Sequence, residues 1–342
     1  MYCIRIHEHG GLDKLVLEEI PPPATGPSDV LIGVKATSLN HLDLWVRKGL
    51  PGVKFKLPII PGVDASGVVV SIGQGVSHVA VGDRVVVAQG ISCGHCVHCL
   101  NGSDNLCKDY LLIGEHRDGA DAEYLSVPGR NVLKLPSAVS FDQAAAGALV
   151  FLTAWQMLVD KARVQPGEDV LVVGAGSGVG SAAIQIAKLH GARVIATTSS
   201  EEKAAHAKLL GADEVIDYRK QNVPDEVRKL TAKRGVDVVF EHVGAAVWED
   251  CIRSLVKGGR LVTCGATSGH EAKTDLRYVF YKQLQIFGST MGKKGDLIKI
   301  LRFFETGALK PVIDRCLPLK EVREAHRLLE EGKQFGKIVL NP

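Results

Sequence analysis

The sequence of 342 residues contains no run of eighteen apolar residues, so it lacks a segment long enough to cross a membrane as a helix. Its N-terminus also lacks the charged stretch followed by an apolar core that marks a secretory signal, and we therefore expect a cytoplasmic protein. Forty-one basic against thirty-eight acidic residues leave a net charge of only +3. No basic run carries interleaved aromatic residues, so neither nucleic acid nor a membrane is an expected partner.

Low-complexity stretches and internal repeats are absent as well. With 46% apolar and 23% charged residues, the composition is that of an ordinary folded protein. A chain of this length exceeds what one hydrophobic core usually organises, so the sequence predicts two domains.

Four of the eight cysteines are crowded into one polar loop with the spacing C-x2-C-x2-C-x7-C, at Cys93, Cys96, Cys99 and Cys107. This spacing allows four thiolates to converge on one zinc ion. A complete set of four thiolates leaves no open position for water or substrate, so the metal would be structural. Two disulfides are the alternative, and the absence of a signal peptide disfavours them. We predict one structural Zn²⁺ per chain.

The hydrophobic pattern changes character along the chain. Up to about residue 130, short β-rich runs such as 30–36 and 66–72 alternate with Gly, Pro and Asp clusters, which predicts a mostly antiparallel, barrel-like unit. From about residue 169, strand, turn and helix repeat, which predicts a doubly wound sheet of roughly six parallel strands. Ser199 and Glu202 have the spacing of a capping box for a helix near 200–210. The last fifty residues end in β-rich runs and are expected to rejoin the first domain.

A glycine-rich loop joins the first strand of the repeating region to its first helix. Its residues are Gly174, Ala175, Gly176, Ser177, Gly178, Val179 and Gly180. Such a loop lets the backbone approach a pyrophosphate and offers N–H groups at a helix N-terminus. A strict G-x-G-x-x-G is missing in the register that opens the helix, but the flanking strand and helix supply the context of a dinucleotide site.

The end of the second strand indicates which dinucleotide is bound. An NAD site usually places a carboxylate there, whereas this chain has Thr198, Ser199 and then Lys203. Hydroxyl groups with a lysine, and Tyr218 further on, suit a 2′-phosphate, which favours NADP(H) over NAD(H). The alternative is that Ser199 only caps the helix and Lys203 is a solvated surface charge.

These segments together resemble the medium-chain dehydrogenase/reductase superfamily, with its zinc-type alcohol dehydrogenases and quinone oxidoreductases. The cysteine loop, the segment 40–49, the glycine loop and Gly211 to Asp217 carry the resemblance. It implies an α/β protein in which a GroES-like catalytic domain (1–149, zinc lobe 91–109) is interrupted by a Rossmann domain (150–288) and completed by residues 289–342. It also implies a homodimer or homotetramer.

The departures from the family pattern concern the catalytic metal. Catalytic-zinc members carry a cysteine where Asn40 stands, a His-Glu pair where Val63 and Asp64 stand, and a cysteine or aspartate at about Leu149. Val63 and Leu149 have no donor atom, and an amide such as that of Asn40 is a poor zinc ligand. Asn40 and Asp43 instead match the N-x-x-D of the zinc-independent quinone oxidoreductases, although Trp45 replaces the tyrosine usual there.

Without a Lewis acid, reduction of a conjugated alkene or quinone is less demanding than exchange with an alcohol, because hydrogen-bond donors can stabilise the anion that forms. We take Asn40, His41 and His116 as candidate donors. The alternatives are that His41 only touches cofactor phosphate and that His116 braces a loop. The resemblance adds further cofactor contacts at Thr153, Val243, Gly265 and Ser289.

Three functions stay open on the sequence. The first is an NADP(H)-preferring reductase of conjugated carbonyl compounds, alkenes or quinones that works without catalytic zinc. The second is an alcohol or aldehyde dehydrogenase whose zinc uses atypical ligands such as His41, Asp64 and His116. The third is a cofactor-binding protein without significant catalysis. In each case the expected ligands are small molecules.

Overall fold

The computed structural model describes residues 1–50 and 52–342 and divides the chain into two compact units. We call Met1–Leu149 with Lys293–Pro342 the split unit, and Val150–Gly292 the central unit. The sequence predicted that the chain re-enters the first domain at residue 289, whereas in the structure the second segment of the split unit begins at Lys293.

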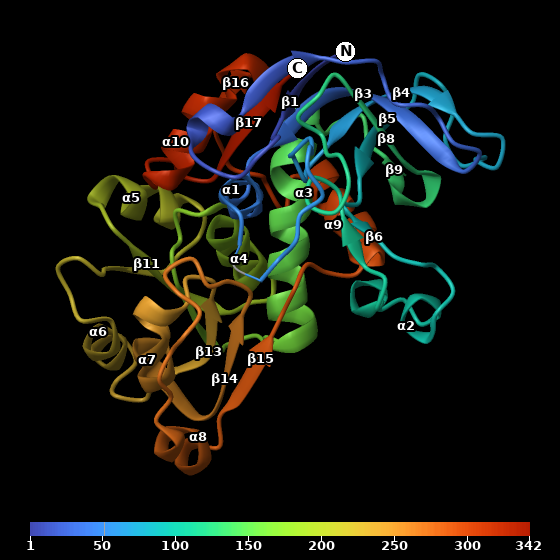
Figure 1. The fold of residues 1–342 in the computed structure, drawn as a ribbon. Coiled ribbons are helices and arrows are strands. Elements are labelled where there is room, and N and C mark those ends of the chain that lie inside the picture. Colours follow the sequence, from blue (N-terminus) through green and yellow to red (C-terminus); the bar gives the residue numbers. More distant parts are fainter. Residues whose placement is uncertain (51) are drawn as a thin grey trace. The chain divides into compact units, whose positions relative to one another are not determined.

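The central unit is built on a parallel sheet with the strand order β12-β11-β10-β13-β14-β15 (Figure 1). Its strands are β10 (Asp169–Val172), β11 (Arg193–Thr198), β12 (Glu214–Asp217), β13 (Val236–Glu241), β14 (Leu255–Thr263) and β15 (Gln285–Gly288). Its helices are α4 (Gly178–Leu189), α5 (Glu201–Leu209), α6 (Val223–Leu230), α7 (Ala245–Ser254) and α8 (Leu276–Lys282). For the described residues, this confirms the prediction of a doubly wound sheet of six parallel strands.

The start of α5 corrects one prediction. Ser200, and not Ser199, is the N-cap residue, and its hydroxyl accepts a hydrogen bond from the backbone N–H of Lys203 at 3.2 Å. Residue 199 still has the spacing of a capping box with Glu202, but β11 continues to Thr198 and the chain needs one more extended residue before the helix can begin. Helix capping therefore does not explain Ser199.

The split unit contains a seven-stranded sheet with the order β16-β17-β3-β4-β5-β9, to which β8 adds by pairing with β3. These strands are β3 (Asp29–Ser38), β4 (Ser66–Ile72), β5 (Arg84–Val87), β8 (Tyr124–Pro128), β9 (Val132–Lys134), β16 (Ile313–Pro318) and β17 (Lys337–Asn341). Two small pairs accompany the sheet, β1 (Tyr2–Arg5) with β2 (Val16–Glu19) and β6 (Gly90–Ile91) with β7 (Leu111–Leu112). All pairings in the sheet are antiparallel except β16 with β17, so the predicted antiparallel character is largely confirmed.

The C-terminal segment rejoins the first part of the chain, as predicted. β17 pairs with β3 in the register Val339↔Ser38 and Leu340↔Thr37. The helices of this unit are α1 (His41–Lys48), α2 (Val97–Leu100), α9 (Lys294–Thr306) and α10 (Val322–Glu330), and α3 (Phe141–Trp155) contains the boundary between the units. No helix in the described part of the chain combines the length and apolar character that crossing a bilayer requires.

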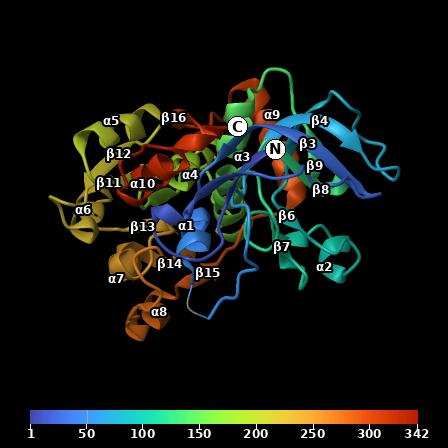
Figure 2. The same ribbon diagram turned by 45° about the horizontal axis from the view of Figure 1, so that its top comes forward.

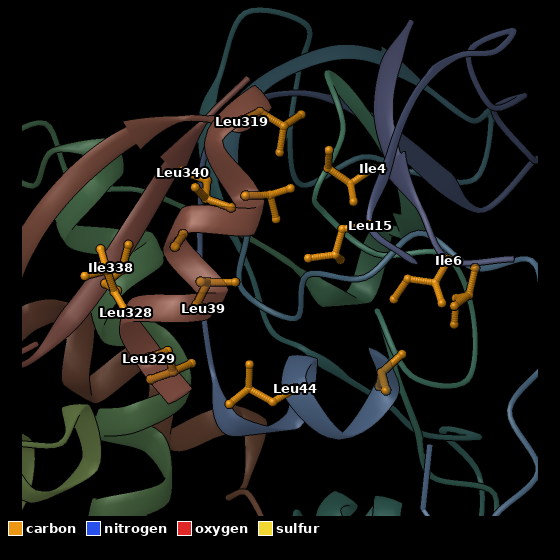
Figure 3. Packing of buried hydrophobic residues seen from close by; sticks show 14 residues of the cluster. Ile4, Ile6, Leu15, Leu39, Leu44, Leu319, Leu328, Leu329, Ile338 and Leu340 are labelled. Atoms are coloured by element: carbon orange, nitrogen blue, oxygen red, sulfur yellow. The ribbon is translucent and has the colours of Figure 1, made fainter. Parts of the chain in front are cut away.

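An apolar cluster explains why the two separate segments of the split unit fold together. Leu44 of α1, Ile4 and Leu15 from the N-terminal region, and Leu328 and Ile338 of the C-terminal segment pack in one buried core (Figure 3). Burial of each such side chain contributes roughly 1.5–3 kcal/mol. Helix α1 thus shares one core with residues from both ends of the sequence.

A buried polar contact accompanies this core. Arg47 of α1 is 1% exposed and donates from Nη1 to Nδ1 of His326 on α10 at 3.3 Å. Nη2 of Arg47 pairs with Glu330, which Lys48 also contacts at 2.6 Å, and its Nε donates to the carbonyl of Gly10 at 3.3 Å. Burial, followed by the positive charge of Arg47, lowers the pKa of His326 to about 3, so this imidazole stays neutral in the folded protein.

This contact predicts acid sensitivity. In an unfolded chain a histidine has a pKa of about 6.5, so below that pH the unfolded protein binds a proton at residue 326. The folded protein binds no proton there until the pH approaches about 3. Across this window His326 lowers stability by up to roughly 1.4 kcal/mol per pH unit. In His326→Gln the group no longer titrates, so we expect the melting temperatures of parent and variant to converge as the pH falls from neutral. Parallel melting curves throughout would contradict the assignment.

Candidate functional site

The cysteine loop contains the short helix α2 and lies next to the β6–β7 pair (Figure 2). It brings its four sulfur atoms together. The Sγ atoms of Cys93, Cys96, Cys99 and Cys107 all lie within 4.8 Å of one another. Sulfur atoms bound at about 2.3 Å to one zinc lie within about 4.6 Å of one another. The predicted ligand set therefore fits a tetrahedral zinc ion, and all eight cysteines are unpaired, so the disulfide alternative is not seen.

Backbone donors stabilise negative charge on three of the four sulfur atoms, whereas the pKa of Cys96 is raised to about 11. Backbone N–H groups of Cys93, Gly94 and Cys96 donate to Sγ of Cys107, Cys99 and Cys93, each at 3.4 Å. A hydrogen bond from the backbone of His95, followed by one from Cys96, lowers the pKa of Cys93 to about 6. Hydrogen bonds that favour thiolate are what a zinc ligand needs, because only the deprotonated sulfur binds the metal.

In the central unit, the glycine loop has the geometry of a phosphate cradle. Gly174 adopts the left-handed conformation with φ of 66°, and its N–H donates to Oγ1 of Thr197 at 3.0 Å. Ser177 caps α4 by accepting a hydrogen bond from the N–H of Gly180 at 2.9 Å. A Cβ atom at Gly180 would lie 2.4 Å from the carbonyl oxygen of Gly174, so only glycine allows this close approach of helix and strand.

His242 supports this loop, and the sequence analysis missed it. Its Nε2 lies 3.1 Å from Oγ of Ser177, whose hydroxyl donates to the carbonyl of Gly174 at 2.9 Å. Because the serine proton is already used, Nε2 of His242 is the donor in this contact. Burial lowers the pKa of His242, which keeps the ring neutral under the loop. A histidine at the end of an apolar strand was the only available signal.

The predicted cofactor residues gather at one edge of the sheet, because each follows the carboxyl end of a parallel strand. Gly174 follows β10, Ser199 β11, Tyr218 β12, Val243 β13, Gly265 β14 and Ser289 β15. Ligands bind at this edge in doubly wound sheets. Ser289 is 9% exposed, its N–H donates to Thr263 at 2.9 Å, and its hydroxyl is buried without a protein partner. Thr153, on α3, is also largely buried.

The end of β11 carries the residues that would select between the two dinucleotides. The N–H of Tyr218 donates to the carbonyl of Thr198 at 3.1 Å, which keeps Tyr218 next to the strand end. Lys203 is half-buried in the first turn of α5, in the same turn as the cap residue Ser200. Glu201, which could repel a phosphate, pairs with Lys220 at 3.1 Å.

In the split unit, Asn40 and Asp64 belong to a closed hydrogen-bond network. Oδ1 of Asp64 accepts from Gln89 at 2.7 Å and from the N–H of Leu149 at 3.1 Å. Its Oδ2 accepts from Ser38 and from Asn40, both at 2.9 Å, and from Lys337 at 3.3 Å. The amide of Asn40 also donates to the carbonyl of Ser38 at 3.2 Å. The amide nitrogen of Asn40, predicted as a candidate donor to substrate, therefore donates to two protein acceptors in this structure.

Asp43, the other half of the N-x-x-D pattern, holds backbone in place. Its carboxylate accepts from the N–H of Asn40 at 2.7 Å and from that of Gly62 at 3.1 Å. Burial raises the pKa of Asp43 to about 6. Asp121 lies on the other side of Gly62, accepts from Thr37 at 3.0 Å, and has its pKa raised to about 8 by burial and by Asp43.

The remaining candidates differ in their surroundings. His41 and Trp45 are both half-buried and stand one helical turn apart on α1, so they share a face of that helix. His116 accepts the N–H of Leu112 on Nδ1 at 3.2 Å and lines a hollow of about 750 Å³ with Arg5 and Lys56. That contact is the loop-bracing role considered as the alternative for His116.

The positions at which the family resemblance would place a catalytic zinc carry few side-chain donor atoms. The side chains of Val63, which is fully buried, and of Leu149 have no metal-ligand atom, and the backbone N–H of Leu149 donates to Asp64. Among the described residues, the one group of three or more His, Cys, Asp or Glu side chains with ligand atoms at metal-binding separation is the cysteine set. His41, Asp64 and His116 do not form such a group.

Comparison with known proteins identifies the family of the chain. Family models match as the alcohol dehydrogenase GroES-like domain over residues 26–137 and as the zinc-binding dehydrogenase over residues 178–306. A crystal structure of an NAD-dependent alcohol dehydrogenase is 51% identical, with a TM-score of 0.97 and full coverage of both chains. Human quinone oxidoreductase is 31% identical over 99% of this chain and 97% of its own length.

A third relative was solved with ligands bound. The structure of the 2-octenoyl-CoA carboxylase reductase CinF in complex with NADP and 2-octenoyl-CoA is 29% identical, with a TM-score of 0.91, and covers 99% of this chain and 87% of its own. The chain belongs to the medium-chain dehydrogenase/reductase superfamily and is an oxidoreductase.

We expect one zinc ion per chain, bound by the four cysteines. Cys96→Ser should lower the zinc content from one to near zero and lower the melting temperature, because the metal orders the loop. Cys316→Ser, at an exposed cysteine outside the loop, is the matched control and should change neither quantity. Elemental analysis of protein purified without chelator measures the ratio. Two zinc ions per chain would instead favour the alcohol dehydrogenase assignment.

Proposed function

We propose that this protein is an NADP(H)-preferring oxidoreductase that transfers hydride to a conjugated carbonyl compound, alkene or quinone without a catalytic zinc ion. The observation that carries the proposal is the closed network around Asp64. Both of its carboxylate oxygens are occupied by protein donors, and its neighbours Val63 and Leu149 offer no ligand atom. A catalytic zinc would have to displace several of these hydrogen bonds.

The chemistry follows from what the residues can supply. When bound, the reduced nicotinamide supplies the hydride. The enolate or hydroquinone anion that results needs hydrogen bonds and a proton, which donors of the protein or water can provide. Asn40 is committed to Asp64 and Ser38, so we assign it to positioning and keep His41 as the candidate donor from the start of α1.

The preference for NADP(H) rests on the end of β11. The residue after Thr198 is Ser199 and not a carboxylate, and capping is performed by Ser200. Tyr218 is hydrogen-bonded to Thr198, and Lys203 lies in the first turn of α5. The relative solved with NADP and an enoyl-CoA supports a reductase of this kind. The competing assignment is an NAD-dependent alcohol dehydrogenase, the name of the 51% identical structure.

We further propose a homo-oligomer and a cytoplasmic location. β15 is an edge strand of its sheet, and Ile286 on it is 40% exposed. On α8, Phe280 is 70% exposed and Tyr281 is 67% exposed. An apolar sheet edge of this kind is a ready template for pairing with a second copy. Light scattering that finds a monomer at micromolar concentration would refute the oligomer.

A substrate panel tests the proposed reaction. Alcohols, aldehydes, enones and quinones are assayed with both cofactors, before and after mild chelation that leaves the cysteine-bound zinc in place. We expect turnover with enones or quinones, unchanged by chelation, because the active-site chemistry needs no metal. Activity confined to alcohols and aldehydes, lost with a second zinc and restored by it, would establish the competing dehydrogenase. Failure to oxidise reduced cofactor with any member would leave a binding protein.

Lys203→Ala tests the cofactor preference. Loss of a charge-assisted hydrogen bond should weaken NADPH binding by roughly ten- to a hundredfold, while NADH binding should hardly change. Lys208→Ala, at an exposed lysine of the same helix, is the control. Fluorescence titration of the reduced cofactor measures both affinities. Equal losses for NADPH and NADH would assign Lys203 to the fold, and tighter binding of NADH by the parent would refute the preference.

A further inference from the structure

Lys337, at the start of β17, is a buried cation that takes part in the polar network of the split unit. It is 4% exposed, and its ammonium donates to Oδ1 of Asn40 at 2.5 Å and to Oδ2 of Asp64 at 3.3 Å. A charged amine in so dry a place is costly unless it is paired and hydrogen-bonded. Burial lowers the pKa of Lys337, and the charges of Asp64 and Asp43 act against that shift.

The position of Lys337 is fixed by strand pairing. β17 and β3 pair as Val339↔Ser38, and the N–H of Leu39 donates to the carbonyl of Ile338 at 3.0 Å. In the same register Ile338 lies opposite Leu39, and the next pair sets Lys337 opposite Asn40. The lysine therefore reaches the amide from the facing strand, without the freedom of a surface side chain.

The bond from Lys337 determines which way the Asn40 amide faces. Because the ammonium can only donate, Oδ1 of Asn40 must point toward it, and Nδ2 is then directed at Asp64 and the carbonyl of Ser38. The backbone N–H of Asn40 is held separately by Asp43. Asn40 directly precedes helix α1, and its Oδ1, its Nδ2 and its backbone N–H thus each have a defined partner.

We propose that Lys337 is a positioning residue of the reductase site: its ammonium orients the Asn40 amide and balances the charge of Asp64 at the place where catalytic-zinc relatives bind their metal. This inference rests on the proposed function for its catalytic part. The lysine acts through Asn40 and the start of α1, where His41 and Trp45 follow. Its two tasks, charge balance and orientation, are separable by mutation.

The experiment compares Lys337→Met with the double variant Asp64→Asn/Lys337→Met. Lys337→Met leaves the Asp64 carboxylate buried without its cation, so we expect the unfolding equilibrium constant to rise on the order of a hundred- to a thousandfold. Asp64→Asn in that background removes the uncompensated charge and should restore most of the stability. The double variant still lacks the donor for Oδ1 of Asn40, so kcat should stay roughly ten- to a hundredfold below the parent.

Cofactor affinity serves as an internal control, because the glycine loop lies in the central unit. We expect the dissociation constant for NADPH to stay within about twofold of the parent in both variants. Lys320→Met, at an exposed lysine of the C-terminal segment, is the matched control and should leave stability and kcat unchanged. Urea denaturation and hydrogen exchange of the β3 and β17 amides report stability, and steady-state kinetics separate kcat from KM.

Each outcome decides one part of the proposal. A stable Lys337→Met variant with parental kcat overturns it entirely. A double variant that recovers both stability and kcat limits Lys337 to charge balance and refutes the positioning role, and a double variant as unstable as the single one refutes charge balance. If the parent reduces no enone or quinone, the proposed function fails, whereas the comparison of stabilities still tests the pairing of Lys337 with Asp64.

Discussion

Val339 and Leu340 of β17 pair with Ser38 and Thr37 at the end of β3, and this register delivers the C-terminal strand to the start of helix α1. The side-chain period of a strand is two, so a slip of one residue would turn Lys337 to the other face of the sheet and leave Asp64 without its cation. The buried charge and the strand register thus specify each other. The charge penalises the wrong register, and the correct register compensates the charge.

The apolar core around Leu44 stabilises the association of the C-terminal segment with helix α1. Helix α1 is short, and isolated helices of its length are unstable in water. Leu44 packs among Leu328, Leu329 and other C-terminal side chains, and Arg47 reaches His326 and Glu330 on α10. The helix that carries His41 and Trp45 is therefore stable only when the last fifty residues are in place. A truncated chain that ended after the central unit would lose the packing partners of its own candidate site.

Sequence reasoning was accurate where the physical cause is local. The four cysteines stand within fifteen positions, so their convergence follows from loop closure alone, and the six parallel strands follow from apolar runs at regular intervals. It was wrong by one residue at Ser199, where the length of β11 decided between two adjacent serines. It missed Lys337 and Gln89 because their partner Asp64 is reached only through tertiary pairing. His242 was missed for the same reason.

The charge balance of the network explains a further feature of the split unit. Asp43, Asp64 and Asp121 are all fully buried, whereas Lys337 is the cation bonded among them. Three ionised carboxylates beside one ammonium would carry an uncompensated charge in a medium of low polarity. Burial and the neighbouring Asp43 raise the pKa of Asp121 to about 8, so this acid holds its proton at neutral pH and adds no charge. Asp43 accepts hydrogen bonds from two backbone N–H groups, which stabilise its carboxylate. Asp64 accepts hydrogen bonds from five donors, and the ammonium of Lys337 is one of them. In the reductase that we propose, these fixed hydrogen bonds take the place of a catalytic metal, which is why we propose hydride acceptors whose product anion needs only hydrogen bonding.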